Sequence, residues 1–266
     1  MDPESSEVQE DFILTTYTPP TTLSESLKGK LISSLKLLAE CFEKLESPDQ
    51  LVLGFNGGKD SIVMFHLVRA IFNYVLQRDD PVISYLQSCG EGDLLHSFNV
   101  EISSCRYIFF QFLEEEEFPE VISYCDIFEK EFDISIEKFT GKMKDDLTSL
   151  VDNDRVTTVI VGNRRTDPYS EHLKPVDPSS EGWPDFMRIH PLLDWSYVEI
   201  WEFLNYFKFE VCCLYEQGYT SLGRMHKTQK NPYLRRSSEE LRDSQAEYYP
   251  AWHLTDDLKE RESRIK

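Results

Sequence analysis

The sequence lacks the features of a membrane or secreted protein. None of its uncharged apolar runs approaches the ~18 residues that a membrane span needs, and Met1 is followed by acidic and polar residues instead of a signal peptide. The six cysteines contain no C-x-x-C pair and have no closely spaced histidine pair nearby, which argues against a structural metal site or a disulfide framework. Cys212 and Cys213 are either a redox pair or buried hydrophobes, and we assign no chemistry to them. We expect a cytoplasmic protein without membrane contact.

Positive charge is also scarce. The 266 residues include 28 Lys and Arg against 48 Asp and Glu, a net charge of −20. Because nucleic-acid binding needs a dense basic surface, we expect small-molecule partners, no nucleic acid, and a local site for any phosphate. Residues 101–150 hold 13 acidic and 5 basic side chains, whereas residues 161–236 hold 10 of each, so we expect the anion site in the second segment. The acidic run at 114–117 is either a solvated loop or has a role with an acidic partner or a metal.

Apolar periodicity predicts helices and strands that alternate along the chain. Spacings of three and four residues predict helices at 27–45, 61–77, 118–132, 142–152 and 196–206. Short apolar runs predict strands at 51–55, 105–112, 133–137 and 156–161, and we take 156–161 as the last strand. Within 81–104 we leave open whether 82–86 or 99–102 forms an additional strand or an insertion. The alternation predicts an α/β protein with a doubly wound, mostly parallel sheet and helices on both faces.

The two ends of the chain differ from this α/β region. The first residues are acidic and then rich in Thr and Pro, so we expect a flexible arm over 1–25. The α/β domain is expected to span 26–236. Residues 237–266 form a highly charged C-terminal extension in which we expect a helix, and the sequence alone is compatible with a merely solvated one.

A glycine-rich turn follows the first predicted strand. The turn is Gly54-Phe55-Asn56-Gly57-Gly58-Lys59-Asp60-Ser61. It precedes a predicted helix, where α/β proteins bind phosphate because the first N–H groups of the helix are unpaired. It is not a Walker A loop, since the spacing is one residue short and Lys59 is followed by Asp60, and no G-x-G-x-x-G fingerprint is present. Alone it fits a structural turn as well as a phosphate site. In a phosphate site Lys59 brings positive charge, Asp60 recruits a cation and Ser61 caps the helix.

Further polar and aromatic stretches follow the strand at 156–161. Gly162-Asn163-Arg164-Arg165-Thr166-Asp167-Pro168-Tyr169 lies at the carboxyl edge of the predicted sheet, where open α/β sheets bind ligands. Its two arginines are either solvated charge or a planar fork for phosphate. Gly182-Trp183-Pro184-Asp185-Phe186-Met187-Arg188-Ile189 follows. Its tryptophan either packs or seats a flat heterocycle whose phosphate contacts Arg188.

The amino-acid motifs in these segments resemble those of a known group of enzymes. Asn-Gly-Gly-Lys-Asp-Ser at 56–61 is similar to the pyrophosphate loop of the ATP-pyrophosphatase (PAPS reductase-like) group, whose adenine nucleotide alpha hydrolase-like domains split ATP between its α and β phosphates. The motifs G-N-R-R-T-D-P-Y, W-P-D-F-M-R-I, P-L-L-D-W and L-Y-x-x-G-Y-T-S-L-G follow in this order, and over residues 51–266 the set resembles eukaryotic FAD synthases. Sulfonucleotide reductases share the loop but use a C-terminal cysteine motif, whereas no cysteine follows Cys213.

The resemblance implies an FMN adenylyltransferase. Such enzymes transfer AMP from ATP to the phosphate of FMN and release FAD and pyrophosphate, with Mg²⁺. Because the FMN phosphate is already ionised at neutral pH, catalysis rests on positioning and charge neutralisation, and no general base is needed. This agrees with the dispersed histidines: we interpret His190, His226 and His253 as ordinary surface or core residues.

The resemblance also implies which residues form the site. The implied catalytic residues are Asn56, Asp60, Asp167, Arg261 and Arg264, with Asp60 and Asp167 as the implied Mg²⁺ ligands. The implied nucleotide- and flavin-binding residues are Phe55, Gly57, Gly58, Lys59, Ser61, Gly162, Asn163, Arg164, Thr166, Trp183, Pro184, Asp185, Phe186 and Arg188. Arg261 and Arg264 are three residues apart on the expected C-terminal helix, so they share one face of it. We expect residues 237–266 to pack back on the active site, which would bring both arginines to the same phosphates. A monomer suffices for this arrangement.

Two other functions stay open. Another ATP α–β cleaving enzyme of the same group, with a different acceptor, should have reactive cysteines or a basic RNA-binding surface, and the sequence shows neither. A catalytically silent flavin- or nucleotide-binding protein would bind its ligand without turnover.

Overall fold

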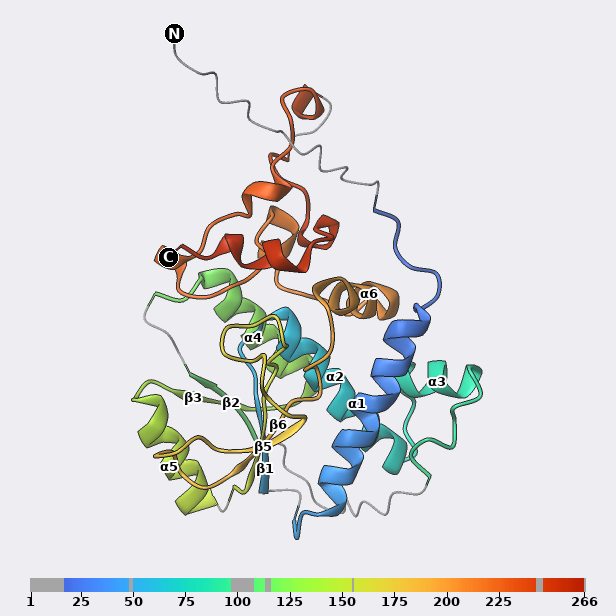
Figure 1. The fold of residues 1–266 in the computed structure, drawn as a ribbon, viewed down its shortest axis with the longest axis vertical. Helices are drawn as coiled ribbons and strands as arrows, with labels where there is room; N and C mark the ends of the chain where they lie inside the picture. The colour runs from blue at the N-terminus through green and yellow to red at the C-terminus, as the bar shows by residue number, and fades with distance from the viewer. Residues whose placement is uncertain are drawn as a thin grey trace.

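Figure 1 shows the fold as a computed structural model, which describes residues 17–47, 50–96, 108–112, 116–154, 156–242 and 246–265. Several sequence-based expectations therefore fall outside the described residues. These are the first 16 residues of the expected arm, the possible strand at 99–102, residues 105–107 of the strand expected at 105–112, and residues 114 and 115 of the acidic run. The remaining segments form a twisted sheet with helices packed against it.

The sheet is mostly parallel, as expected. Its strands are β1 Leu51–Gly54, β2 Ile108–Phe112, β3 Ile136–Phe139, β4 Thr158–Ile160, β5 Val176–Pro178 and β6 Met187–Ile189, in the order β3-β2-β1-β4-β6-β5. All neighbouring pairs are parallel except β5 and β6. The prediction that the strand at 156–161 is the last was wrong, because β6 pairs with β4 and β5 continues the edge. Each of these two strands has three residues, which is too short to show a period-two pattern.

The predicted helices are present with shifts of a few residues. In the described part of the chain the α-helices are α1 Glu25–Glu43, α2 Lys59–Val75, α3 Pro81–Ser88, α4 Pro119–Phe132, α5 Met143–Asp154 and α6 Tyr197–Phe207. The segment at 82–86, left open above, lies in α3 and is not a strand. Asp80 starts this helix by accepting hydrogen bonds from the N–H groups of Val82 (2.9 Å) and Ile83 (3.3 Å). In this part of the chain the helices are all too short or too polar to cross a bilayer.

Both faces of the sheet are covered. Leu51 and Leu53 of β1 join the larger core cluster, which includes residues of α1, α2, α4 and α6. Val52, between them, joins a smaller cluster with Leu147 and Leu150 of α5 on the other face. Because successive strand residues point to opposite faces, β1 is buried on both sides. The expected doubly wound arrangement is therefore confirmed.

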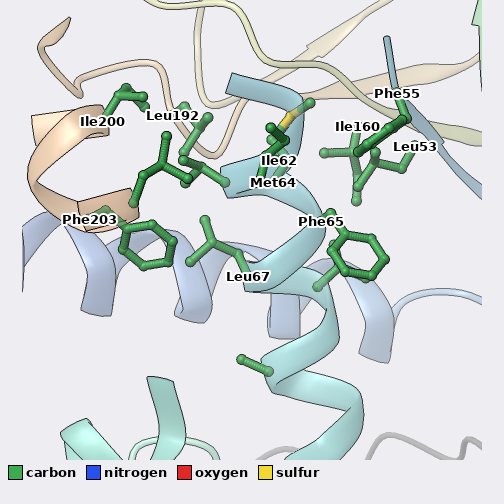
Figure 2. Packing of buried hydrophobic residues seen from close by; sticks show 14 of the residues in the cluster. Leu53, Phe55, Ile62, Met64, Phe65, Leu67, Ile160, Leu192, Ile200 and Phe203 are labelled. Atoms are coloured by element: carbon green, nitrogen blue, oxygen red, sulfur yellow. The ribbon is translucent and has the colours of Figure 1, made fainter. Parts of the chain in front are cut away.

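Helix α2, which follows the glycine-rich turn, is held tightly in the larger cluster. Figure 2 shows apolar side chains of α2 between those of β1, β4 and α6; the labelled residues are Leu53, Phe55, Ile62, Met64, Phe65, Leu67, Ile160, Leu192, Ile200 and Phe203. Full burial of a side chain of this kind stabilises the fold by about 1.5–3 kcal/mol. The first turn of α2 is thus fixed relative to the carboxyl end of β1.

The chain beyond α6 is built from short 3-10 turns. They include η2 Cys213–Gln217, η4 Pro232–Leu234 and η7 Asp257–Ser263, and in Figure 1 these orange and red segments gather beside α6 and α4. The expected C-terminal helix is thus a 3-10 helix: Arg261 lies inside η7 and Arg264 is its C-cap. In a 3-10 helix residues three apart are nearly eclipsed, so these two positions still share a side of the turn.

One buried histidine has no hydrogen-bonding partner. His190, directly after β6, is 1% exposed, and neither ring nitrogen has a hydrogen-bond partner among the described residues. Burial, with a smaller effect from Arg188, lowers the pKa of His190 to about 4, although Asp177 opposes the shift. The residue is a neutral core histidine at physiological pH, in agreement with its interpretation from the sequence.

The lowered pKa predicts how stability depends on pH. The unfolded chain binds a proton at His190 near pH 6.5 and the folded chain only near pH 4, so the free energy of unfolding should fall as pH drops through this window, by at most about 3 kcal/mol. Denaturant unfolding at pH 7.5 and pH 4.5 should show a smaller fall for His190→Gln than for the parent chain. His172→Gln, at an exposed histidine, should leave the fall unchanged, and an equal effect of both substitutions would contradict this account.

Candidate active site

A cavity of about 860 Å³ opens where the central strands end. Its lining includes Gly54, the last residue of β1, and Phe55 after it, residues of β2, and Val161 and Gly162 after β4. In the sheet β1 lies between β2 and β4. On one side of β1 the sheet continues through β2 to β3, and on the other it continues through β4 to β6 and β5. A topological switch point of this kind is where open α/β sheets bind ligands.

The glycine-rich turn forms one wall of the cavity. Asn56 Oδ1 accepts a hydrogen bond from the Gly58 N–H (3.0 Å), which closes the turn on itself. Gly57 has φ +68°, and a Cβ at this position would lie 2.9 Å from Cys125 Sγ, so both backbone conformation and space require glycine. Gly58 is the N-cap of α2. Ser61 is therefore not the cap that the sequence suggested; it lies on the first turn, where its hydroxyl donates to the Gly58 carbonyl (2.8 Å).

Four charged side chains form a closed ring beside this turn. The Lys59 ammonium lies 2.9 Å from Asp60 Oδ2 and 2.5 Å from Glu260 Oε1. Arg164 lies 2.9 Å from Asp60 Oδ1 through Nε and 2.5 Å from Glu260 Oε2 through Nη2. Each charge thus contacts two charges of opposite sign. We call these four residues the charge ring.

The charge ring is ionised and electrically neutral. Burial alone would raise the pKa of Asp60, but Arg164 and Lys59 together lower it. Burial alone would lower the pKa of Lys59, but Asp60 and Glu260 together raise it. Two cations and two carboxylates leave no net charge, so the ring by itself does not neutralise a bound phosphate.

The remaining positive charge lies elsewhere around the cavity. The basic side chains that line it outside the charge ring are Arg188, Arg224, Lys227, Arg261 and Arg264. Arg264 is held by hydrogen bonds from Nε to Ser221 Oγ (2.9 Å) and from Nη2 to the Leu222 carbonyl. In a chain of net charge −20 this is a local concentration of cations, as the anion site expected from the sequence requires.

A third carboxylate, that of Asp167, lies close to the ring. Its Oδ2 accepts a hydrogen bond from the Arg164 N–H (2.9 Å), and its Oδ1 is 3.6 Å from Arg261 Nη1. Burial raises the pKa of Asp167, and the Arg164 contacts oppose this shift. The described residues contain no group of three or more His, Cys, Asp or Glu side chains arranged to hold a metal ion. A cation here would therefore need oxygen ligands from a substrate.

Another part of the cavity lining is apolar, and we call it the apolar wall. It is formed by side chains from β2, from α5 and from the segment before β6, namely Phe110, Phe112, Met143, Leu147, Trp183 and Phe186. Trp183 is 39% exposed and lines the cavity. A cavity with one cationic and one apolar wall suits a molecule that joins a flat ring system to phosphates.

The structure brings most of the sequence-based candidates together. Those that line the cavity are Phe55, Asn56, Gly58, Lys59, Asp60, Ser61, Gly162, Asn163, Asp167, Trp183, Phe186, Arg188, Arg261 and Arg264. Those outside the lining are Gly57, Arg164, Thr166, Pro184 and Asp185. The side chain of Arg164 is 1% exposed and belongs to the charge ring, whereas Thr166 and Asp185 are exposed.

Sequence reasoning missed several lining residues. Tyr215 is buried and its hydroxyl accepts the first N–H of α2, that of Lys59 (2.9 Å). It belongs to the motif L-Y-x-x-G-Y-T-S-L-G, so that signal was available. Arg224 and Lys227 follow the same motif directly. For Glu260 the only sequence signal was its place beside Arg261.

Comparisons with known proteins agree on one family. The model of the phosphoadenosine phosphosulfate reductase domain matches residues 139–230. A probable FAD synthase of Schizosaccharomyces pombe is 31% identical over 250 residues, which are 94% of this chain and 84% of the relative. Two probable FAD synthases of Caenorhabditis match 88% of this chain, which spans 40% of their length.

Solved structures give the same result. The crystal structure of Candida glabrata FMN adenylyltransferase is similar with a TM-score of 0.70 and 25% identity, over 91% of this chain and 88% of that chain. The crystal structure of yeast FAD synthetase in complex with FAD is similar with a TM-score of 0.69 and 27% identity, over 92% of this chain and 93% of that chain.

The charge ring predicts a contrast between two neighbouring arginines. Arg164→Gln leaves Asp60 and Glu260 with one buried cation, so it should lower the free energy of unfolding by about 3–5 kcal/mol. Arg165→Gln removes an ion pair to Asp194 in which both side chains are exposed, and it should cost less than about 1 kcal/mol. Denaturant unfolding of both variants measures the difference. Equal losses would show that the ring is not a major stabilising contact.

Proposed function

Because this chain belongs to the FAD synthase family, we propose that it is an FMN adenylyltransferase, which transfers AMP from ATP to the phosphate of FMN and releases FAD and pyrophosphate. One observation carries the proposal: a single cavity at the β1/β4 edge joins the glycine-rich turn and its surrounding cations to an apolar wall with an accessible tryptophan. The reaction needs both halves, since a triphosphate and a flavin must meet there.

The proposed chemistry is displacement at the α-phosphorus of ATP. A terminal oxygen of the FMN phosphate attacks the α-phosphorus and forms a new P–O bond. The bond from the α-phosphorus to the oxygen that bridges it to the β-phosphorus breaks, and pyrophosphate leaves with that oxygen. The attacking oxygen carries negative charge at neutral pH, so no side chain has to remove a proton. The acceleration of the reaction comes from alignment of the two substrates and from neutralisation of phosphate charge. This fits a cavity whose lining residues include cations and no histidine.

We propose that the glycine-rich turn holds the leaving pyrophosphate. Asn56 fixes the turn through its hydrogen bond to Gly58, and the absence of a side chain at Gly57 and Gly58 lets phosphate oxygens approach the backbone near the start of α2. Arg261 and Arg264, which line the cavity from η7, are placed to neutralise phosphate charge from the other side.

On the flavin side we propose that the isoalloxazine ring lies along the apolar wall. Trp183 and Phe186 line this wall, and Arg188, the middle residue of β6, also lines the cavity, so we propose that it contacts the FMN phosphate. Gly162 and Asn163, which follow β4, also line the cavity, and we propose that they lie between the two substrates. For Thr166, Pro184 and Asp185, which are outside the lining, a contact with FMN stays a prediction from the family resemblance.

A magnesium ion is part of this proposal. Asp60 and Asp167 both line the cavity, and Asp60 Oδ1, although 2.9 Å from Arg164 Nε, accepts no hydrogen bond among the described residues. Two carboxylates with phosphate oxygens from the nucleotide match what Mg²⁺ requires, so the residues present fit the ion. When bound, Mg²⁺ would screen the triphosphate and polarise it for attack.

We also propose the oligomeric state, the location and the partners of the protein. The catalytic residues implied by the resemblance, Asn56, Asp60, Asp167, Arg261 and Arg264, line one cavity within a single chain, so a monomer would suffice, and we propose that it is active. The sequence features discussed above support a cytoplasmic location and small-molecule partners only.

A direct assay tests the proposed function. The purified chain, incubated with ATP, MgCl₂ and FMN and resolved by chromatography, should form FAD and pyrophosphate. Asn56→Ala removes the hydrogen bond that shapes the turn and should lower the rate of FAD formation about 100-fold without changing the unfolding midpoint, because Asn56 is exposed. Gln217→Ala, an exposed amide outside the cavity lining, is the control and should retain the parent rate.

The same assay separates the alternatives. Bound flavin without turnover would favour a silent flavin-binding protein, and ATP cleavage without FAD would favour a relative with another acceptor. An Asn56→Ala variant with the parent rate would remove Asn56 from the proposed site.

A further inference from the structure

We propose that Glu260 is a positioning residue for nucleotide binding: through Lys59 and Arg164 it keeps the Asp60 carboxylate available beside the glycine-rich turn, and it thereby ties the C-terminal segment to the ATP side of the cavity. The inference rests on the proposed function only in that ATP is taken as the ligand of this turn.

The contacts of Glu260 are those of a residue that acts on other side chains. Its carboxylate is 5% exposed, and its two oxygens contact two different cations at 2.5 Å, Lys59 through Oε1 and Arg164 through Oε2. Asp60 contacts the same two cations with its own two oxygens. Glu260 thus supplies half of the negative charge that the two buried cations need.

Removal of that charge would change the state of Asp60. With Glu260 neutral, Asp60 would be the single carboxylate facing Lys59 and Arg164, and two buried cations would compete for it. Asp60 already contacts one cation with each oxygen, and without Glu260 both cations would be attracted to this one carboxylate more strongly. Its oxygens would then be less available to a magnesium ion. The nucleotide side of the cavity is therefore where a defect should appear.

The backbone around Glu260 is fixed independently of its side chain. Thr220 Oγ1 donates to the Glu260 carbonyl (2.6 Å), and the Thr220 N–H donates to Ser263 Oγ (3.0 Å). Asn231 Nδ2 donates both to Thr220 Oγ1 and to the Lys259 carbonyl, each at 2.8 Å. Thr220, Asn231 and Ser263 are all fully buried. This hydrogen-bonded clamp places the Glu260 carboxylate at the ring, and it should stay in place when the carboxylate is changed to an amide.

The flavin side gives an internal reference. Among the described residues the Glu260 side chain forms ion pairs with Lys59, at the start of α2, and with Arg164, in the loop after β4. The apolar side chains of the cavity come instead from β2, α5 and the segment before β6. A positioning role predicts a loss confined to ATP. A purely structural role predicts a loss of stability that affects both ligands alike.

The test compares Glu260→Gln with Glu262→Gln, a neighbouring exposed glutamate. Dissociation constants for a non-hydrolysable ATP analogue with Mg²⁺ and for FMN are measured separately by calorimetry, together with the unfolding midpoint and steady-state constants. Glu260→Gln should weaken binding of the analogue about 10- to 100-fold and raise the KM for ATP similarly, with FMN binding within about twofold of the parent. Glu262→Gln should match the parent chain in all of these measurements.

Glu260→Asp extends the test. It keeps the charge, and its shorter side chain can still reach one of the two cations, so its analogue affinity should lie between those of the parent and Glu260→Gln. If Glu260→Gln does not fold, Glu260→Asp alone decides, with an expected loss of about 3- to 10-fold for the ATP analogue only. Parent-like affinity for the analogue in Glu260→Gln, or equal losses for the analogue and FMN, would overturn the proposal. A parent chain that binds the analogue but makes no FAD would overturn the proposed function and leave this test valid.

Discussion

The charge ring of Lys59, Asp60, Arg164 and Glu260 is the interaction on which the rest of the site depends. It joins the first turn of α2, the loop after β4 and the last 3-10 turn, and its most distant members are 201 residues apart in the sequence. Loss of any one charge leaves its partners buried and unbalanced, so the three segments are held in one arrangement. The glycine-rich turn, Asp167, Arg261 of η7 and Arg264 at its C-cap take their positions from these segments. The ring is neutral, so the unbalanced positive charge of the cavity lining comes from Arg188, Arg224, Lys227, Arg261 and Arg264.

Much of the fold follows from local sequence signals. The strand at Leu51–Gly54 and the helices on either side of it were predicted because their apolar residues recur with a clear period and are interrupted by Gly and Pro. The short strands β5 and β6 were missed, since three residues carry no period and their pairing depends on β4. The 3-10 turns after α6 were equally unpredictable, because hydrogen bonds between distant side chains, such as Asn231 to Thr220, set their path.

The family motifs predicted more residues of the site than physical arguments from the sequence did. The turn at 56–61 and the loop at 162–167 were found because both follow buried strands, and both line the cavity. What the sequence could not supply is which charges pair. Arg164 was expected to face a substrate, but it lies inside the ring, and Glu260 looked like one of many acidic residues in a solvated tail. Pairing across 96 or more residues depends on the tertiary fold, which local patterns do not encode.

The central claim is that ATP and the flavin meet at the β1/β4 edge, with the pyrophosphate end of ATP against the glycine-rich turn. The most direct test is a crystal structure with a non-hydrolysable ATP analogue, FMN and Mg²⁺. We predict the β- and γ-phosphates beside Gly57 and Gly58, the isoalloxazine ring along Trp183, and the FMN phosphate facing the α-phosphorus between them. A triphosphate away from this turn, or a flavin outside the cavity, would contradict the account.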